Sequence, residues 1–224
     1  MGFINNLKAS IIHMSKDFKP FDPASLQDEI ALKTQWTPVR RGGTSFKTHN
    51  IHKSSTFRLE IRPSLMSLLF PLIFCLAGLA PIVIIFLQKQ TTPLLDNVLI
   101  PVLFGSIFLI VGIVLFLFTN TPHFFDKSLG FYWKGKKSDD QVQQAKVKCR
   151  LADIYALQII SEYIRNTSSS GSGSSYHSYE INLVLKTGER INVLDHGARN
   201  KIMEQAKELS EFLNVPVWNP VNFL

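Results

Sequence analysis

Two uncharged apolar stretches decide how this chain folds: Leu65–Leu87, LMSLLFPLIFCLAGLAPIVIIFL, and Val98–Phe118, VLIPVLFGSIFLIVGIVLFLF. At about 1.5 Å of rise per residue, each stretch forms a helix long enough to cross the roughly 30 Å hydrocarbon core of a bilayer. Buried helices of soluble domains are rarely this long without a charged residue. The sequence therefore predicts residues 64–118 as a transmembrane hairpin, with spans at about 65–87 and 98–118.

The charges around the two spans predict their orientation. The connection Gln88–Asn97 is short, so the segments outside the hairpin lie on the same side of the membrane. Lysine and arginine accumulate on the cytoplasmic flanks of membrane spans. The connection carries only Lys89, whereas the outer flanks carry Lys47, Lys53, Arg58, Arg62, Lys127, Lys134, Lys136 and Lys137. This asymmetry predicts a multi-pass protein of the cell inner membrane with both termini in the cytoplasm.

Composition restricts the partners of the remaining chain. The 224 residues carry a formal net charge of +7. The basic excess is greatest before the first span, where it suits membrane topology and contact with anionic lipid, so no nucleic-acid partner is expected. Cys75 lies within the first span and Cys149 far beyond the second, which predicts no disulfide and fits a reducing compartment.

The interior of the spans favours anchoring over transport. Neither span contains an ionisable side chain apart from the Cys75 thiol. Transport pathways and proton relays usually need such groups within the membrane. Gly78, Gly105 and Gly112 allow helices to approach closely. We therefore expect either a simple anchor or a surface that packs on another membrane protein, and the sequence leaves both alternatives open.

Residues 1–43 are predicted as an N-terminal helix and linker. Residues 1–16 place apolar residues at helical spacing, which indicates an amphipathic helix on the membrane surface or on the protein's own core. Residues 17–42 are rich in proline and aspartate, and they predict an extended linker around a short helix at Ser25–Lys33.

Residues 44–63 are predicted as a β-hairpin next to the membrane. Two runs, Thr44–Ile51 and Thr56–Ile61, are strand-like and are joined by a short polar turn. In the second run, apolar residues alternate with charged ones, which is the pattern of a half-buried strand.

Residues 119–224 are predicted as a cytoplasmic domain of about six antiparallel strands closed by a helix. Period-2 alternation or clustered aromatic and branched residues mark the strands, which include Phe124–Asp126, Phe131–Trp133, Val147–Leu151, Ala156–Ile164, Tyr179–Leu185 and Ile191–Val193. The serine- and glycine-rich segment Asn166–Ser175 predicts a mobile loop. Ala198–Leu213 predicts a helix with Asp195 as its N-cap. The predicted fold class is thus an α+β membrane protein: a two-helix transmembrane hairpin plus a small antiparallel β-sheet or barrel closed by a C-terminal helix.

Several motifs in this domain resemble those of a bacterial family. They are Phe125-Asp126, Gly130-Phe131-Tyr132-Trp133, Leu151-Ala152-Asp153-Ile154-Tyr155-Ala156-Leu157-Gln158, Tyr179-Glu180-Ile181-Asn182-Leu183-Val184-Leu185, Asp195-His196-Gly197 and Leu213-Asn214-Val215-Pro216-Val217-Trp218. Together with the hairpin, they resemble uncharacterised bacterial two-span membrane proteins with a C-terminal pleckstrin-homology-like (PH-like) cytoplasmic domain. The resemblance implies a PH-like fold and a membrane location, and it implies no activity and no functional residue.

No pattern predicts a catalytic residue, a metal site or a cofactor. His49 and His52 have a spacing seen in metal sites, but no third ligand follows nearby. Asp195 and His196 are adjacent, and no serine or cysteine nucleophile in a motif accompanies them. We expect structural roles for these residues, and we do not expect an enzyme.

The candidate site is the run Trp133-Lys134-Gly135-Lys136-Lys137. An aromatic residue followed by lysines near a span suits contact with anionic lipid headgroups, each lysine contributing ~1 kcal/mol. The alternative is a solvated basic turn. The sequence thus predicts a membrane-anchored binding or scaffold module that docks a protein partner or anionic lipid headgroups. The alternative function is an accessory subunit of a larger transport or secretion complex, whose hairpin helices pack on a membrane-protein partner.

Overall fold

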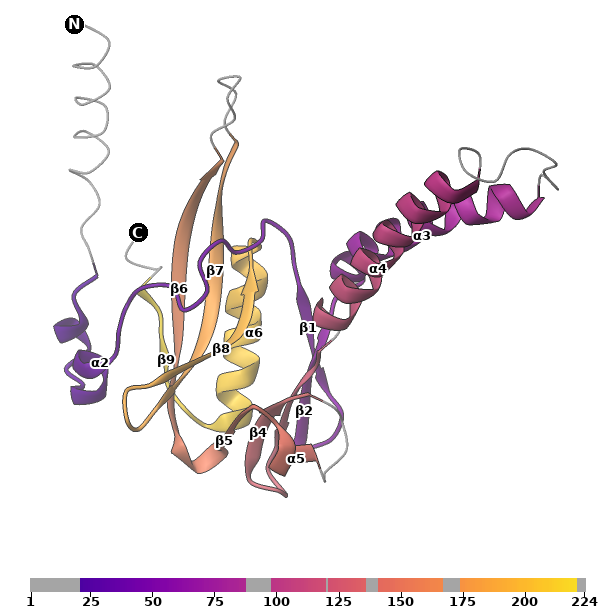
Figure 1. Cartoon of the computed structure of the whole chain (residues 1–224). Helices are drawn as coiled ribbons and strands as arrows, with labels where there is room; N and C mark the ends of the chain where they lie inside the picture. Colours follow the sequence, from indigo (N-terminus) through magenta and orange to yellow (C-terminus); the bar gives the residue numbers. More distant parts are fainter. Residues whose placement is uncertain (1–20, 88–97, 120, 136–140, 167–173, 221–224) are drawn as a thin grey trace, which may run out of the picture.

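Two long helices project from a domain of two β-sheets (Figure 1). The structure is a computed structural model, and it describes residues 21–87, 98–119, 121–135, 141–166 and 174–220. The predicted helix at residues 1–16 and most of the predicted loop at Asn166–Ser175 lie outside these residues. The projecting helices are α3 (Leu65–Leu87) and α4 (Ile100–Thr119), and both are long and apolar enough to cross a membrane.

The helices α3 and α4 pack closely on each other and expose most of their remaining surface. The side chains of Leu65, Phe86 and Phe118 are 82%, 84% and 79% exposed. The contact between the helices depends on glycine. A Cβ atom on Gly78 would lie 2.6 Å from the carbonyl oxygen of Gly105, and a Cβ atom on Gly105 would lie equally close to the carbonyl oxygen of Gly78. The predicted close approach at these glycines is confirmed.

Replacing Gly105 with leucine should therefore separate the two helices. Inserting a large side chain into a closely packed contact typically costs about 1–3 kcal/mol. We expect the full chain in mild detergent to melt at a lower temperature than the unchanged protein. Ala80→Leu is the matched control, because the side chain of Ala80 is exposed. Equal melting temperatures for the two variants would show that the glycine contact does not hold the helices together.

The first sheet combines strands that precede the helix pair in the sequence with strands that follow it. Its order is β1-β2-β3-β4-β5, and every neighbouring pair is antiparallel. The strands are β1 (His49–Lys53), β2 (Arg58–Pro63), β3 (His123–Asp126), β4 (Phe131–Lys134) and β5 (Val147–Arg150). The first strand begins at His49 and not at Thr44, while β2, β3 and β4 match the predicted runs closely.

The helix pair is inserted into the turn between two neighbouring strands. Strand β2 runs into α3, strand β3 follows α4, and the two strands pair with Ile61 opposite His123. Residues 44–63 therefore supply two strands to the sheet that the C-terminal part of the chain completes.

The second sheet lies on the other side of the C-terminal helix (Figure 1). Its order is β8-β7-β6-β9, and only β9 runs parallel to its neighbour. The strands are β6 (Ile154–Asn166), β7 (Ser174–Leu185), β8 (Arg190–His196) and β9 (Val217–Trp218), and a short 3-10 helix, η3 (Leu151–Asp153), precedes them. The parallel strand β9 was not predicted, because two residues are too few to show a period.

The C-terminal helix α6 (Arg199–Leu213) fills the space between the sheets. Its buried side chains include Ile202, Ala206 and Leu209, which share one core with Leu59 of β2 and Ile181 of β7. The core therefore needs residues that precede the inserted helices in the sequence as well as residues that follow them.

The predicted N-cap of this helix is wrong. The N-cap residue is Ala198, and no side chain caps the helix. Asp195 lies one residue before the end of β8, and its carboxylate accepts a hydrogen bond of 2.7 Å from the hydroxyl of Ser178. The strand continues to His196, so it holds Asp195 in the sheet and away from the first turn of α6.

The N-terminal segment is packed against the second sheet. The predicted short helix is divided into η1 (Pro23–Leu26) and α2 (Glu29–Lys33). After it, the chain runs without regular structure to β1, and the ring centroids of Trp36 and Trp218 lie 5.7 Å apart. The buried carboxylate of Glu180 accepts hydrogen bonds from the backbone N–H groups of Val39, at 2.8 Å, and Arg40, at 2.7 Å. The predicted linker is thus fixed in place by contacts with the sheet.

Candidate functional site

Trp133 and Lys134 point to opposite faces of β4, because side chains alternate along a strand. The ring of Trp133 lies on the outer face of the first sheet, stacked 5.1 Å from the ring of Phe124. Val142 of α5 (Gln141–Gln144) packs in the same cluster, and Trp133 is fully buried. The prediction that Trp133 contacts lipid headgroups is therefore corrected. Lys136 and Lys137 lie outside the described residues, so their role stays a prediction.

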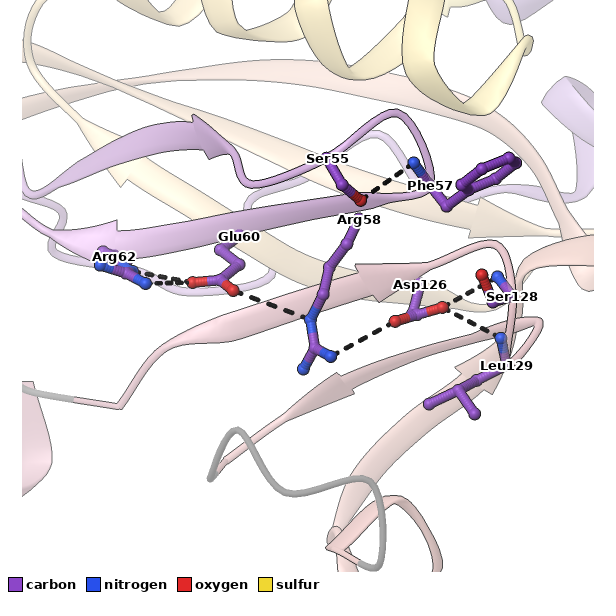
Figure 2. Close-up of polar contacts among 8 residues, drawn as sticks. All are labelled: Ser55, Phe57, Arg58, Glu60, Arg62, Asp126, Ser128 and Leu129. Atoms are coloured by element: carbon purple, nitrogen blue, oxygen red, sulfur yellow. Dashed lines mark hydrogen bonds and ion pairs between the residues drawn. The ribbon is translucent and has the colours of Figure 1, made fainter.

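The outer face beside this cluster holds interlocked ion pairs (Figure 2). The Arg58 guanidinium lies 5.2 Å from the ring centroid of Phe124, and its Nη1 lies 3.4 Å from Oδ2 of Asp126. Nη2 of Arg62 lies 2.5 Å from Oε2 of the buried Glu60. Two basic residues of the predicted cytoplasmic flank are thus engaged by carboxylates of the sheet: Arg58 joins β2 to Asp126 of β3, and Arg62 pairs with Glu60 within β2.

Lys134 lies on the inner face of the first sheet, at the end nearest the helices. It pairs across the sheet with His123, whose ring lies 5.9 Å from the ring of His49. Burial lowers the pKa of Lys134, and the nearby charge of Arg40 lowers it further. In the part of the chain that the structure describes, the side chains of Lys134 and Arg40 form no ion pair.

These two cations line a cavity of about 730 Å³ between the helices and the domain, here called the junction cavity. Its polar side is formed by Lys134 and by the segment that leads into β1, with the lining residues Arg40, Thr44, Thr48 and His49. Its apolar side comes from the beginning of α3 and the end of α4, with the lining residues Met66, Leu69, Phe70, Ile73 and Phe118. Among the described residues, no carboxylate lines it. The arrangement suits a molecule with an anionic end and an apolar end.

A second cavity, of about 790 Å³, lies between Lys33 and the β7–β8 turn. It is a weaker candidate, because its arginine is already engaged in hydrogen bonds and a carboxylate lines it. Arg190 donates hydrogen bonds to the carbonyl oxygen of Thr37, at 2.6 Å, and to Oε1 of Gln158, at 3.1 Å. Glu189 also lines the cavity and would repel an anion.

The histidines near the junction cavity are held by hydrogen bonds within the domain. Nδ1 of His123 lies 3.0 Å from the Tyr132 hydroxyl, and Nε2 of His196 lies 2.8 Å from Oε1 of Gln205. Burial lowers the pKa of His49 to about 4, with the charge of Lys134 adding to the effect. Burial likewise lowers the pKa of His123 and of His196. At neutral pH these rings are uncharged parts of the fold.

Acidification should destabilise the domain through these rings. A histidine in an unfolded chain titrates near pH ~6.5. Between about pH 6.5 and about 4, the unfolded chain therefore binds protons that the folded chain does not, and stability falls as the pH falls. We expect a lower melting temperature of the full chain at about pH 5 than at about pH 7.

The variant His123→Gln should reduce this pH dependence, since it removes one of the groups that take up a proton on unfolding. His52→Gln is the matched control, because His52 is exposed. A pH dependence that both variants leave unchanged would contradict this account of the buried rings.

No model of a known protein family matches the chain, and no curated protein matches it. The resemblance to bacterial two-span membrane proteins therefore stays a prediction.

The sequence pointed to one member of the junction cavity and missed the others. Lys134 was found because lysines near a span are conspicuous. Arg40 stands in a segment that shows no periodicity, so the sequence does not indicate it. In the structure its backbone N–H donates to Glu180, and the residue lines the cavity. The spacing of His49 and His52 raises only the question of a metal site, because the neighbours of His49 across the sheet cannot be read from spacing.

Proposed function

We propose that α3 and α4 span a lipid bilayer and anchor the two-sheet domain at its cytoplasmic surface. The observation that carries this proposal is the exposed apolar surface of the two helices. Side chains along their whole length stand exposed, among them Leu65, Phe70, Ile73, Leu76, Ile84, Phe86, Phe104, Ile110, Leu117 and Phe118. Soluble monomers rarely expose a contiguous apolar patch larger than a few hundred Å², whereas a bilayer provides the apolar surroundings that this surface needs.

The cytoplasmic orientation is supported by the distribution of charge. Basic residues stand on the domain side of both helices, and the connection between the helices carries a single lysine. In this orientation, the end of the domain from which α3 and α4 project faces the inner leaflet, where anionic lipids give a negative surface potential. Lys134 and the junction cavity lie at this end.

The anchored domain, in this proposal, is a binding module that contacts anionic lipid headgroups. Lys134, with Lys136 and Lys137 beside it in the sequence, supplies the basic surface. The alternative of an accessory subunit is less well supported, because Gly78 and Gly105 are already used in the contact between α3 and α4. Small residues of this kind are what a further helix would need for close packing.

The proposal extends to a PH-like fold for the domain. Two sheets, antiparallel apart from strand β9, and a C-terminal helix that closes the core between them support it. The insertion of the helix pair between β2 and β3 would then place the open end of this fold against the membrane.

The test uses the full chain in nanodiscs of phosphatidylcholine, with and without phosphatidylglycerol. We expect hydrogen exchange of the amides in residues 121–135 to be slower when the anionic lipid is present. A variant with Lys134, Lys136 and Lys137 all changed to serine should lose this difference. Identical exchange in both lipids would contradict the proposed contact with headgroups. Release of the full chain from membranes by alkaline carbonate would contradict the proposed membrane anchor.

A further inference from the structure

We infer that the junction cavity binds one anionic glycerophospholipid, with its phosphate between Lys134 and Arg40 and one acyl chain along the first turns of α3. This inference rests on the proposed membrane location of the helices, and it names the ligand of the membrane-facing end of the domain. It differs from general contact with headgroups, because it requires a single bound lipid at a defined place.

The phosphate end is built from two cations that line the same cavity. Glu180 fixes the backbone of Arg40, and pairing with His123 fixes the position of Lys134 in β4. The two like charges repel, and the pKa of Lys134 is lowered by burial and by Arg40. An anion between them would relieve both costs, because charge-assisted hydrogen bonds to phosphate are among the stronger polar contacts. The carboxylate-free lining favours an anion over a cation or a zwitterion.

The histidine beside these cations, His49, adds no positive charge to the cavity at neutral pH. Burial, with Lys134 and Arg40 adding, lowers the pKa of His49 to about 4, so its ring is neutral at neutral pH. Its Nδ1 lies 2.8 Å from the hydroxyl of Thr48, which in turn donates a hydrogen bond of 2.5 Å to the backbone oxygen of Asp195. The carboxylate of Asp195 is engaged with Ser178. The positive charge in the cavity therefore comes from Lys134 and Arg40.

The apolar end continues from the cations onto the helices. Leu69, Phe70 and Ile73 line the cavity and are 47%, 56% and 61% exposed. They belong to the first turns of α3, where the proposed span enters the membrane from the domain side. A volume of about 730 Å³ lies within the usual range of small-molecule sites and suits a headgroup with the beginning of one chain. A free phosphate would leave this apolar wall without a partner.

The experiment measures lipid bound to the full chain, purified in mild detergent and stripped of lipid, by native mass spectrometry. We expect one molecule of phosphatidylglycerol to bind, and phosphatidylcholine to bind about tenfold more weakly. Lys134→Ser and Arg40→Ser should each weaken phosphatidylglycerol binding by about fivefold. Lys53→Ser is the matched control and should leave binding unchanged, because Lys53 pairs with Leu59 at the end of β1 away from the helices.

Three results would overturn the inference: equal binding of the two lipids, no effect of either cavity variant, or displacement of the lipid by inorganic phosphate or glycerol phosphate at similar concentration. The last result would identify a site for a soluble phosphate. All three leave the carbonate test untouched, so failure of the lipid site is distinguishable from failure of the proposed anchor.

Discussion

Replacing residues 64–120 with Asn-Gly is expected to give a soluble, folded domain. Strands β2 and β3 pair directly, with Ile61 opposite His123 as the last pair before the helices. Extending this register by two residues would place Pro63 opposite Thr121. A two-residue Asn-Gly turn is the favoured connection for such an antiparallel pair. Among the described residues, the core between the two sheets contains no side chain from α3 or α4. The change therefore removes the exposed apolar surface and keeps the packing between the two sheets and α6.

The measurement is size-exclusion chromatography in buffer without detergent, with circular dichroism and a cooperative thermal melt. A fragment of residues 121–224 is the informative control. It lacks Leu59 and Ile61, which are fully buried in the core. Losing two such side chains costs about 2–5 kcal/mol each, which is a large share of the stability of a typical domain. Aggregation of the Asn-Gly variant would show that the domain depends on the helices.

The second large effect is expected for Glu180→Ala. The Glu180 carboxylate is 2% exposed, and it accepts the backbone N–H groups of Val39 and Arg40 and the side-chain amide of Asn182. Alanine would leave these donors without their acceptor, and hydrogen bonds to a charged group are worth about 1.5–3 kcal/mol each. We expect a loss of about 3 kcal/mol of unfolding free energy and weaker binding of phosphatidylglycerol, because Arg40 is no longer fixed.

Chemical denaturation of the soluble Asn-Gly variant, with and without this change, measures the loss. Glu189→Ala is the matched control, because Glu189 is exposed in the β7–β8 turn. Each substitution removes one glutamate carboxyl group, the buried one of Glu180 in β7 or the exposed one of Glu189 in the β7–β8 turn. Equal unfolding free energies for the two would show that the contact with the N-terminal segment contributes nothing to stability.

Local patterns were enough to predict the long helices and most strands. Uncharged apolar runs mark α3 and α4 directly, and alternation marks β2 with its charged outer residues Arg58, Glu60 and Arg62. Arrangement in space was harder to predict. The pairing of β2 with β3 joins residues about sixty positions apart, and spacing within either strand carries no information about that partner.

The candidate site shows the same limit more sharply. Adjacent residues on a strand face opposite sides, so the pair Trp133-Lys134 divides into a buried ring and a cavity lysine once β4 is formed. The second cation of the junction cavity, Arg40, comes from a segment without regular structure, and Glu180 of β7 binds the backbone of that segment. A site assembled from such distant contacts becomes visible only when the tertiary structure is known.

The most direct test of the central proposal is thiol labelling of intact cells with a membrane-impermeant maleimide. The background is the chain with Cys75→Ser and Cys149→Ser, to which Thr91→Cys, between the helices, or Lys186→Cys, in the β7–β8 turn, is added singly. We predict that the Thr91→Cys protein is labelled in intact cells and that the Lys186→Cys protein is labelled only after the cells are permeabilised. Labelling of both or of neither in intact cells, or the reverse pattern, would contradict a bilayer-spanning hairpin with the domain on the cytoplasmic side.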